Sequence, residues 1–153
     1  MSIRDDLNTA LKESLKAKDQ VAMSTIRLIN AAIKDRDIAA RTNGNDDGIA
    51  EAEILSLLQS MVKQRQESSK TYRDADRPEL ADREEAEITV IEKFLPQQMS
   101  EDEMSAAIDA IIADTGAKDI KDMGKVMGQL KAKYAGQLDM AKAGGAVKAK
   151  LAA

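Results

Sequence analysis

Residues 54–62 read ILSLLQSMV, and this stretch decides the fold class of the chain. Its apolar side chains recur at positions 54, 55, 57, 58, 61 and 62, which is the spacing of one face of an α-helix. The pattern predicts an amphipathic helix from about residue 50 to residue 74, apolar in its first half and polar in its second. Because such a helix gains most of its stability by packing its apolar face, the stretch indicates a helical bundle.

Helical periodicity continues on both sides of this segment. Two amphipathic helices are expected before it, over about residues 1–18 and 19–41, and Pro78 fits the first turn of another that ends near Phe94. The expected apolar faces of the first two helices include Leu15, Val21 and Leu28.

A domain boundary is expected at Leu95-Pro96, because the residue before a proline disfavours the helical region. Three shorter helices follow, over about residues 101–114, 120–134 and 140–151, and Ser100 with Glu103 forms a capping-box pattern at the start of the first. The sequence therefore predicts an all-α protein, with an N-terminal bundle of about four helices (1–95) and a C-terminal three-helix domain (96–153).

Composition excludes several classes of chemistry. The chain has no His and no Cys, so His- or Cys-based catalytic triads, ordinary zinc sites and disulfides are unavailable. No carboxylate pair is singled out for acid–base work, and neither a metal nor a cofactor is expected. No apolar run approaches the roughly 18–20 residues that cross a bilayer, and the first residues lack the apolar stretch of a secretion signal. We therefore expect a cytoplasmic protein without membrane contact. We also expect a binding module and not an enzyme.

Charge is distributed unevenly along the chain. Residues 116–153 hold eight lysines against three aspartates, a net charge of +5, while the whole chain carries −4 and residues 1–115 therefore carry −9. A segregated basic surface suits an anionic partner, although lysines that simply solvate short helices remain an alternative. Aromatic residues for base stacking are scarce, so nucleic-acid contact would depend on backbone charge. The candidate nucleic-acid-binding residues are Lys118, Lys121, Lys125, Lys131 and Lys133, with Arg27 and Lys34 on a second, shorter basic line.

Two segments resemble known binding loops without matching them. Residues 43–48 offer oxygen ligands like a calcium-binding loop, but Ile54 stands where the bidentate Glu is needed. Residues 123–128 suggest a phosphate loop, but Val126 stands where Ser or Thr should hold magnesium. Glycines 124 and 128, four apart, favour close helix packing, with or without a phosphate contact by Lys125.

Arg65 continues the apolar seam of its helix and is expected to turn inward. Glu84 and Glu87 continue the seam of the next helix, so antiparallel pairing would bring Arg65 to one of them. An unpaired inward charge costs several kcal/mol, which favours a structural ion pair.

Five motifs follow one another along the chain: Arg27–Ile33, Lys63–Ser68 with Tyr72, Glu84–Ile88, Phe94–Pro96 and Asp122–Met127. Their order and spacing resemble the YqeY family over essentially the whole chain. The resemblance implies an N-terminal bundle and a C-terminal domain similar to the tail of GatB, a subunit of the glutamine-dependent tRNA amidotransferase, where the tail helps to hold tRNA. It implies a link to transamidation, a carbon–nitrogen ligation with glutamine as amido donor, for a chain that lacks the catalytic parts.

The resemblance implies tRNA, or a tRNA-charging or amidotransferase complex, as partner. The sequence departs from the family pattern after Gly136, where Gln137 replaces a basic residue and removes one positive charge from that turn. The alternative is a protein–protein adaptor without a nucleic-acid role, which would dock through the acidic N-terminal bundle. An amidotransferase-type enzyme is a third hypothesis.

Overall fold

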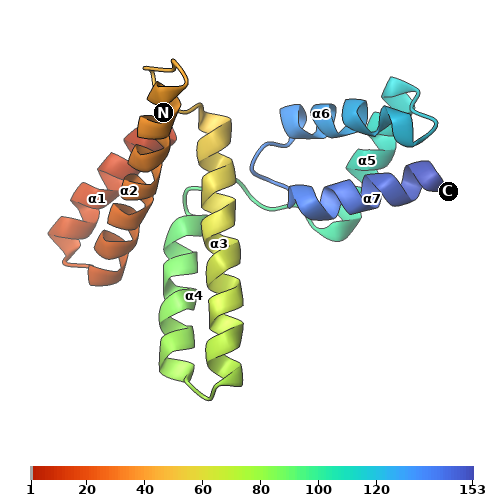
Figure 1. Cartoon of the computed structure of the whole chain (residues 1–153). Helices are drawn as coiled ribbons and strands as arrows, with labels where there is room; N and C mark the ends of the chain where they lie inside the picture. Colours follow the sequence, from red (N-terminus) through yellow and green to blue (C-terminus); the bar gives the residue numbers. More distant parts are fainter. Residues whose placement is uncertain (1) are drawn as a thin grey trace. The chain divides into compact units, whose positions relative to one another are not determined.

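The computed structural model describes residues 2–153, which form helices joined by short loops (Figure 1). The all-α class is confirmed, and each expected helix is present to within a few residues. No helix in this described part is both long and apolar enough to cross a bilayer. The helices are α1 (Ile3–Ala17), α2 (Gln20–Thr42), α3 (Glu51–Asp74), α4 (Pro78–Glu92), α5 (Glu101–Thr115), α6 (Met123–Lys133) and α7 (Met140–Ala152), with a 3-10 turn, η1 (Ile120–Asp122), before α6.

The chain divides into two compact units, the first ending at Leu95 and the second beginning at Pro96. In the N-terminal unit, α1 lies beside α2, and α4 lies beside the later part of α3 (Figure 1). Side chains from all four helices and from the loop before α3 share one apolar core. The buried members are Leu7, Ile26, Ile29, Ile33, Ile49, Ile54, Leu57, Leu58, Met61, Val90 and Ile91.

Three apolar side chains expected on buried faces are exposed. Leu15 is 48% exposed, and Val21 and Leu28 are 40% and 48% exposed. Val21 and Leu28 lie roughly a third of a turn from the row of α2 that contains Ile29 and Ile33, so the neighbouring helices cover only the middle of the apolar stripe. The sequence pattern overstated the width of the buried face.

Asp37 of α2 connects the start of α1 with the loop before α3 through an ion pair and a hydrogen bond. Asp37 accepts two hydrogen bonds from the Arg4 guanidinium, each 2.9 Å, and one from the backbone N–H of Ile49, 2.8 Å. The Arg4 hydrogen bonds, followed by the Ile49 bond, lower the pKa of Asp37 to about 2. Gly48 has φ +88°, and a Cβ there would lie 2.9 Å from Asp37 Oδ1, so this turn requires glycine.

The calcium-like loop uses two of its oxygen atoms in internal hydrogen bonds. The Asn45 side chain accepts from the backbone N–H of Asp47 and donates to the carbonyl oxygen of Gly48, both at 3.1 Å. Within residues 2–153, no three acidic side chains are grouped so that they could share a metal ion.

The C-terminal unit packs α5, α6 and α7 around a second core. Ser100 and Glu103 form the expected capping box, and Asp139 caps α7 by accepting from the backbone N–H groups of Ala141 and Lys142. The expected helix over 120–134 begins as the tighter turn η1, whose N-cap is Asp119. The buried core residues are Ile108, Ile111, Val126, Leu130, Leu138, Ala143, Val147 and Leu151.

Candidate nucleic-acid interface

The lysines predicted to bind nucleic acid are all exposed in the C-terminal unit. Lys118 lies in the loop after α5, Lys121 in η1, Lys125 in the first turn of α6, and Lys131 and Lys133 in its last turn. These five residues are called the lysine surface below. Within residues 2–153 none of them forms an ion pair with a carboxylate.

Asp122 organises one end of the lysine surface. Its carboxylate accepts the backbone N–H of Lys118 at 3.0 Å, and this hydrogen bond is the largest of the causes that lower the pKa of Asp122. The charges of Lys125 and Lys118 lower that pKa further, so both ammonium groups lie within electrostatic reach of the same carboxylate. The fold therefore gathers these two lysines at the start of α6.

Gly124 and Gly128 face solvent on α6, which contradicts the expectation that they permit close helix packing. A Cβ added at either glycine would meet no atom within 4 Å. Val126 and Leu130 instead occupy the packed side of the helix and are fully buried. A glycine inside a helix costs about 1 kcal/mol relative to alanine, so Gly128 is unfavourable to the helix without a packing role in this unit.

Cations of the N-terminal unit are used differently. Five of its arginines pair with carboxylates, at N···O distances of 2.7–4.0 Å. The exposed residues Arg27 and Lys34 have no ion-pair partner among the described residues and lie on α2, in the other unit from the lysine surface. The paired arginines are Arg4, Arg65, Arg73, Arg77 and Arg83.

The C-terminal unit as a whole is electrically neutral, which refines the picture of a basic tail. Residues 96–115 hold five acidic residues and no basic ones, a net charge of −5, while residues 116–153 carry +5. Only Lys150 among the lysines of this described unit forms an ion pair, with Asp109 of α5 at 2.8 Å. The unit is therefore strongly polarised along its sequence, with its positive charge after Gly116.

Arg65 forms its ion pair with Glu87 rather than with Glu84. Arg65 Nε lies 2.9 Å from Glu87 Oε2, and the two side chains are only 14% and 13% exposed. The Arg65 guanidinium also donates to the carbonyl oxygen of Met61 at 3.2 Å. The ion pair therefore joins α3 to α4 and has a structural role.

Polar contacts extend this seam toward the α3–α4 turn. Glu85 accepts from Ser69 at 2.9 Å and pairs with Arg73 at 2.7 Å, and the Arg73 hydrogen bond is the main cause that lowers the pKa of Glu85. Arg73 also reaches Asp82 at 3.0 Å. Ionic contacts therefore close the part of the hairpin that lies beyond the apolar core.

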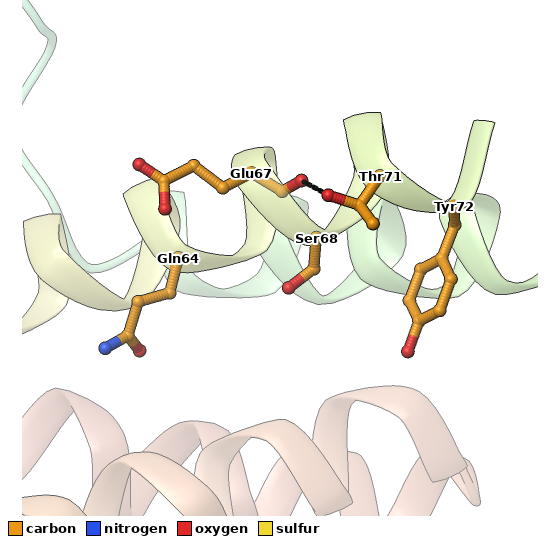
Figure 2. A pocket seen from close by; sticks show the side chains of 5 residues that line it. All are labelled: Gln64, Glu67, Ser68, Thr71 and Tyr72. Carbon is orange, nitrogen blue, oxygen red and sulfur yellow. Dashed lines mark hydrogen bonds between the residues drawn. The ribbon is translucent and has the colours of Figure 1, made fainter. Parts of the chain in front are cut away.

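A polar hollow on α3 was not predicted from the sequence. This open hollow has a volume of about 380 Å³ and is lined by Gln64, Glu67, Ser68, Thr71 and Tyr72. Figure 2 shows the side chains of Gln64, Ser68 and Tyr72 pointing to the same side of the helix, and the Thr71 hydroxyl bonded to the Glu67 carbonyl oxygen. Their spacing of four residues within the polar half of α3 is the signal that could have located this hollow.

The fold and this surface define a class of protein: an all-helical chain of two units, the second of which presents unpaired lysines. The chain belongs to the Yqey-like protein family, whose model matches residues 4–151.

Among curated relatives, the chain is similar to proteins named "Altered inheritance of mitochondria protein 41, mitochondrial". The Lachancea thermotolerans relative is 31% identical over 71% of this chain and 57% of its own length. The Vanderwaltozyma polyspora relative is 30% identical over 58% of this chain and 46% of its own length, and a Saccharomyces cerevisiae relative is 25% identical over 78% and 65%. The chain thus matches about half to two thirds of the length of these relatives.

The names of these relatives contradict the expected cytoplasmic location, since all three are described as mitochondrial proteins. The expectation rested on the missing Cys residues and on the missing apolar secretion signal. Neither feature separates the cytoplasm from mitochondria, because mitochondrial transit peptides are amphipathic and not of the apolar type.

Proposed function

We propose that the C-terminal unit holds structured RNA, with tRNA as the expected ligand, and that the protein is a non-catalytic module of a tRNA-linked complex. The lysine surface is the observation that carries this proposal. Its ammonium groups are exposed and have no carboxylate partner in the described chain, so they can pair with phosphates without first breaking an internal ion pair.

The chemistry of the surface favours recognition of charge and shape. Each phosphate contact releases counterions, so the logarithm of the binding constant should fall by roughly 0.9 per contact for each unit of log salt concentration. Tyr134, the one aromatic residue of the C-terminal unit, packs against the core and does not supply a stacking platform. Weak, salt-sensitive binding without base reading is expected.

The link to glutamine-dependent transamidation is the finer part of the proposal. It rests on the resemblance of the C-terminal unit to the GatB tail. The module would bring tRNA to enzymes that carry the chemistry, and the N-terminal unit would contact the partner protein.

Fluorescence anisotropy with labelled bulk tRNA at about 50 mM salt tests the proposal. The wild-type chain should bind at tens of micromolar or below. The triple variant Lys118→Gln/Lys121→Gln/Lys125→Gln should bind at least ~10-fold more weakly, with a salt slope smaller by about 2–3, because up to three phosphate contacts are removed.

A matched control removes the same charge from the N-terminal unit, through Lys12→Gln/Lys16→Gln/Lys70→Gln, all exposed positions. It should bind tRNA nearly as well as the wild type. No binding by the wild type up to tens of micromolar, or equal weakening by both triple variants, would refute the proposal. A partner protein retained after nuclease treatment, together with no binding to tRNA, would favour the protein–protein adaptor.

A further inference from the structure

The outer face of α2 presents apolar side chains to solvent. Val21, Leu28 and Ile38 are 40%, 48% and 51% exposed, and they are three of the five large apolar side chains that are exposed among residues 2–153. They lie within about 100° of one another around the helix axis. Ile26 and Ile33, which are buried in the core, lie on the opposite side of the helix. Helix α2 is therefore apolar on two sides, and its own unit covers only one of them.

The exposed positions of α2 have the heptad spacing of a helix that pairs with another helix. From residue 21 to residue 38, steps of three and four residues alternate, as the core positions of a paired helix do. Every residue at these positions is exposed. These residues, called the outer seam below, are Val21, Ser24, Leu28, Ala31, Asp35 and Ile38.

A row of cations borders the outer seam along one edge. Arg27, Lys34 and Arg41 recur every seven residues, which places them about 10.5 Å apart along the helix axis, and all three are exposed. Within residues 2–153 none of them forms an ion pair. The Arg4 hydrogen bonds are the main cause that lowers the pKa of Asp37 and the charge of Arg41 is the smallest, so Arg41 is engaged only weakly. In paired helices, residues at such flanking positions contact charged residues of the other helix.

We infer that the outer seam of α2 docks an amphipathic helix of a partner protein whose carboxylates repeat every seven residues. The apolar residues of that helix cover Leu28 and Ile38, and its Asp or Glu side chains pair with the row of cations. This inference rests on the part of the proposed function in which the N-terminal unit contacts a partner protein, and it names the surface and the chemistry of that contact. Because Ser24 and Asp35 interrupt the outer seam, the affinity is moderate, and the charges determine which helix binds and in which direction.

An acidic helix fits this face better than RNA or a lipid surface does. Phosphates would pair with the cations, but they offer no apolar surface to cover Leu28 and Ile38. An amphipathic helix binds a membrane by burying its apolar face in the lipid, and the main apolar face of α2 is already buried in the core of its own unit.

A second copy of the chain also fits this face poorly. Antiparallel pairing of two α2 helices would place Arg27 opposite Arg41 and Lys34 opposite its own equivalent. Parallel pairing would place two Asp35 carboxylates opposite each other in the seam. Like charges in contact disfavour both arrangements, so the face requires a partner of opposite charge.

NMR titration of the isotope-labelled full chain with two synthetic probes, at about 50 mM salt, tests the inference. The first probe is a helical peptide of about four heptads, with Leu at the core positions and Glu at the flanking positions, where the like charges oppose pairing of the peptide with itself. The second probe is an oligoglutamate of the same length, which has the charge but no apolar face. The wild-type chain should bind the first probe with a Kd of about 100 μM or below, and at least ~10-fold more tightly than the second, with the amide shifts concentrated in α2.

Two variants separate the contributions of charge and apolar contact. Arg27→Gln/Lys34→Gln/Arg41→Gln should bind the first probe ~10-fold or more weakly, because it removes the whole row of cations. Leu28→Ser/Ile38→Ser keeps every charge and changes only exposed side chains, so the fold is retained, and it should weaken binding by ~5-fold or more.

The matched control is Lys12→Gln/Lys16→Gln/Lys70→Gln, which removes three exposed positive charges from the same unit. It should bind the first probe as the wild type does. Equal weakening by this control would overturn the inference, because the attraction would then depend on total charge and not on the outer seam.

Three other results would also overturn the inference. One is the absence of amide shifts in α2 with up to about 1 mM of the first probe, and another is wild-type affinity in either α2 variant. The third is binding of the wild-type chain to tRNA, or to vesicles that contain anionic phosphatidylglycerol, that the variant lacking the row of cations loses.

The same measurements separate this inference from the proposed function. If the first probe does not bind but the variant of Lys118, Lys121 and Lys125 still loses tRNA binding, the inference fails and the proposed RNA contact stands. A chain that binds the first probe but not tRNA would overturn the RNA contact and leave the docking surface on α2 supported.

Discussion

Replacing Asp37 by asparagine should destabilise the N-terminal unit at neutral pH and much less at pH 2. The substitution keeps an oxygen that can accept the Ile49 N–H but removes the charge that faces Arg4. A pKa lowered from 3.8 to about 2 corresponds to about 2.4 kcal/mol of folding free energy at pH 7. Because the Arg4 side chain is 40% exposed, water screens part of this interaction, and we expect a loss of about 1–2 kcal/mol.

The pH dependence follows from the direction of the shift. The folded chain binds the Asp37 proton more weakly than the unfolded chain does, so the stabilisation is fully present well above pH 4. Most of it is lost as the pH falls from about 4 to 2, and the rest below the folded-state pKa of about 2, because protonation then favours the unfolded state. The wild-type protein and the Asp37→Asn variant should therefore converge in stability near pH 2.

Urea unfolding at several pH values measures this difference. In a Tyr134→Phe background, tyrosine fluorescence reports only Tyr72 and hence the N-terminal unit. Asp35→Asn is the matched control, since Asp35 is an exposed residue of the same helix without a hydrogen bond or ion pair among the described residues. An Asp37→Asn variant as stable as the wild type at pH 7, or equally destabilised at pH 7 and pH 2, would refute the reasoning.

Two further perturbations test contacts of the N-terminal unit by urea unfolding at pH 7. Glu87→Gln should lower the free energy of unfolding by about 2–3 kcal/mol, because it leaves the half-buried Arg65 guanidinium without its charged partner. The double variant Arg65→Met/Glu87→Leu should lower it by less, since it leaves no unpaired charge, and an unchanged stability of Glu87→Gln would contradict a structural role of the pair. Gly48→Ala should lower the free energy of unfolding by about 2–3 kcal/mol, since the new side chain combines positive φ with a close contact to Asp37. Gly44→Ala, at φ +87° in open space, should lower it by only about 1 kcal/mol, and equal losses would show that the Asp37 contact is unimportant.

Local sequence chemistry predicted most of the helices because each helix end depends on residues close together in the chain. Ser100 and Glu103 form their capping box within one turn, and Pro78 starts α4 without needing a distant partner. The spacing in residues 54–62 likewise predicted a buried row, because an α-helix places those positions on one face whatever packs against it.

The candidate site was only partly predictable. Composition located the lysines, but whether a lysine is paired depends on which carboxylates the fold brings near it. Lys150 meets Asp109, 41 residues away in the chain, whereas Lys125 keeps a free ammonium group beside the already hydrogen-bonded Asp122. The four-residue spacing of Gln64, Ser68 and Tyr72 marks one polar face of α3, but the sequence does not say whether a neighbouring helix covers that face, so the polar hollow was missed.

By itself the sequence determined the all-α class, the helices and their caps, and the accumulation of lysines after Gly116, because periodicity, capping and charge act within a few residues of the chain. Only the tertiary structure decided that Gly124 and Gly128 face solvent, that Val21 and Leu28 remain exposed, and that Arg65 pairs with Glu87. A side chain is buried by segments that are distant in the sequence. Several sides of a helix with many apolar or small residues could therefore be covered, and its own sequence does not say which one is. The packing of whole helices determines which side is buried and which side remains open to a ligand.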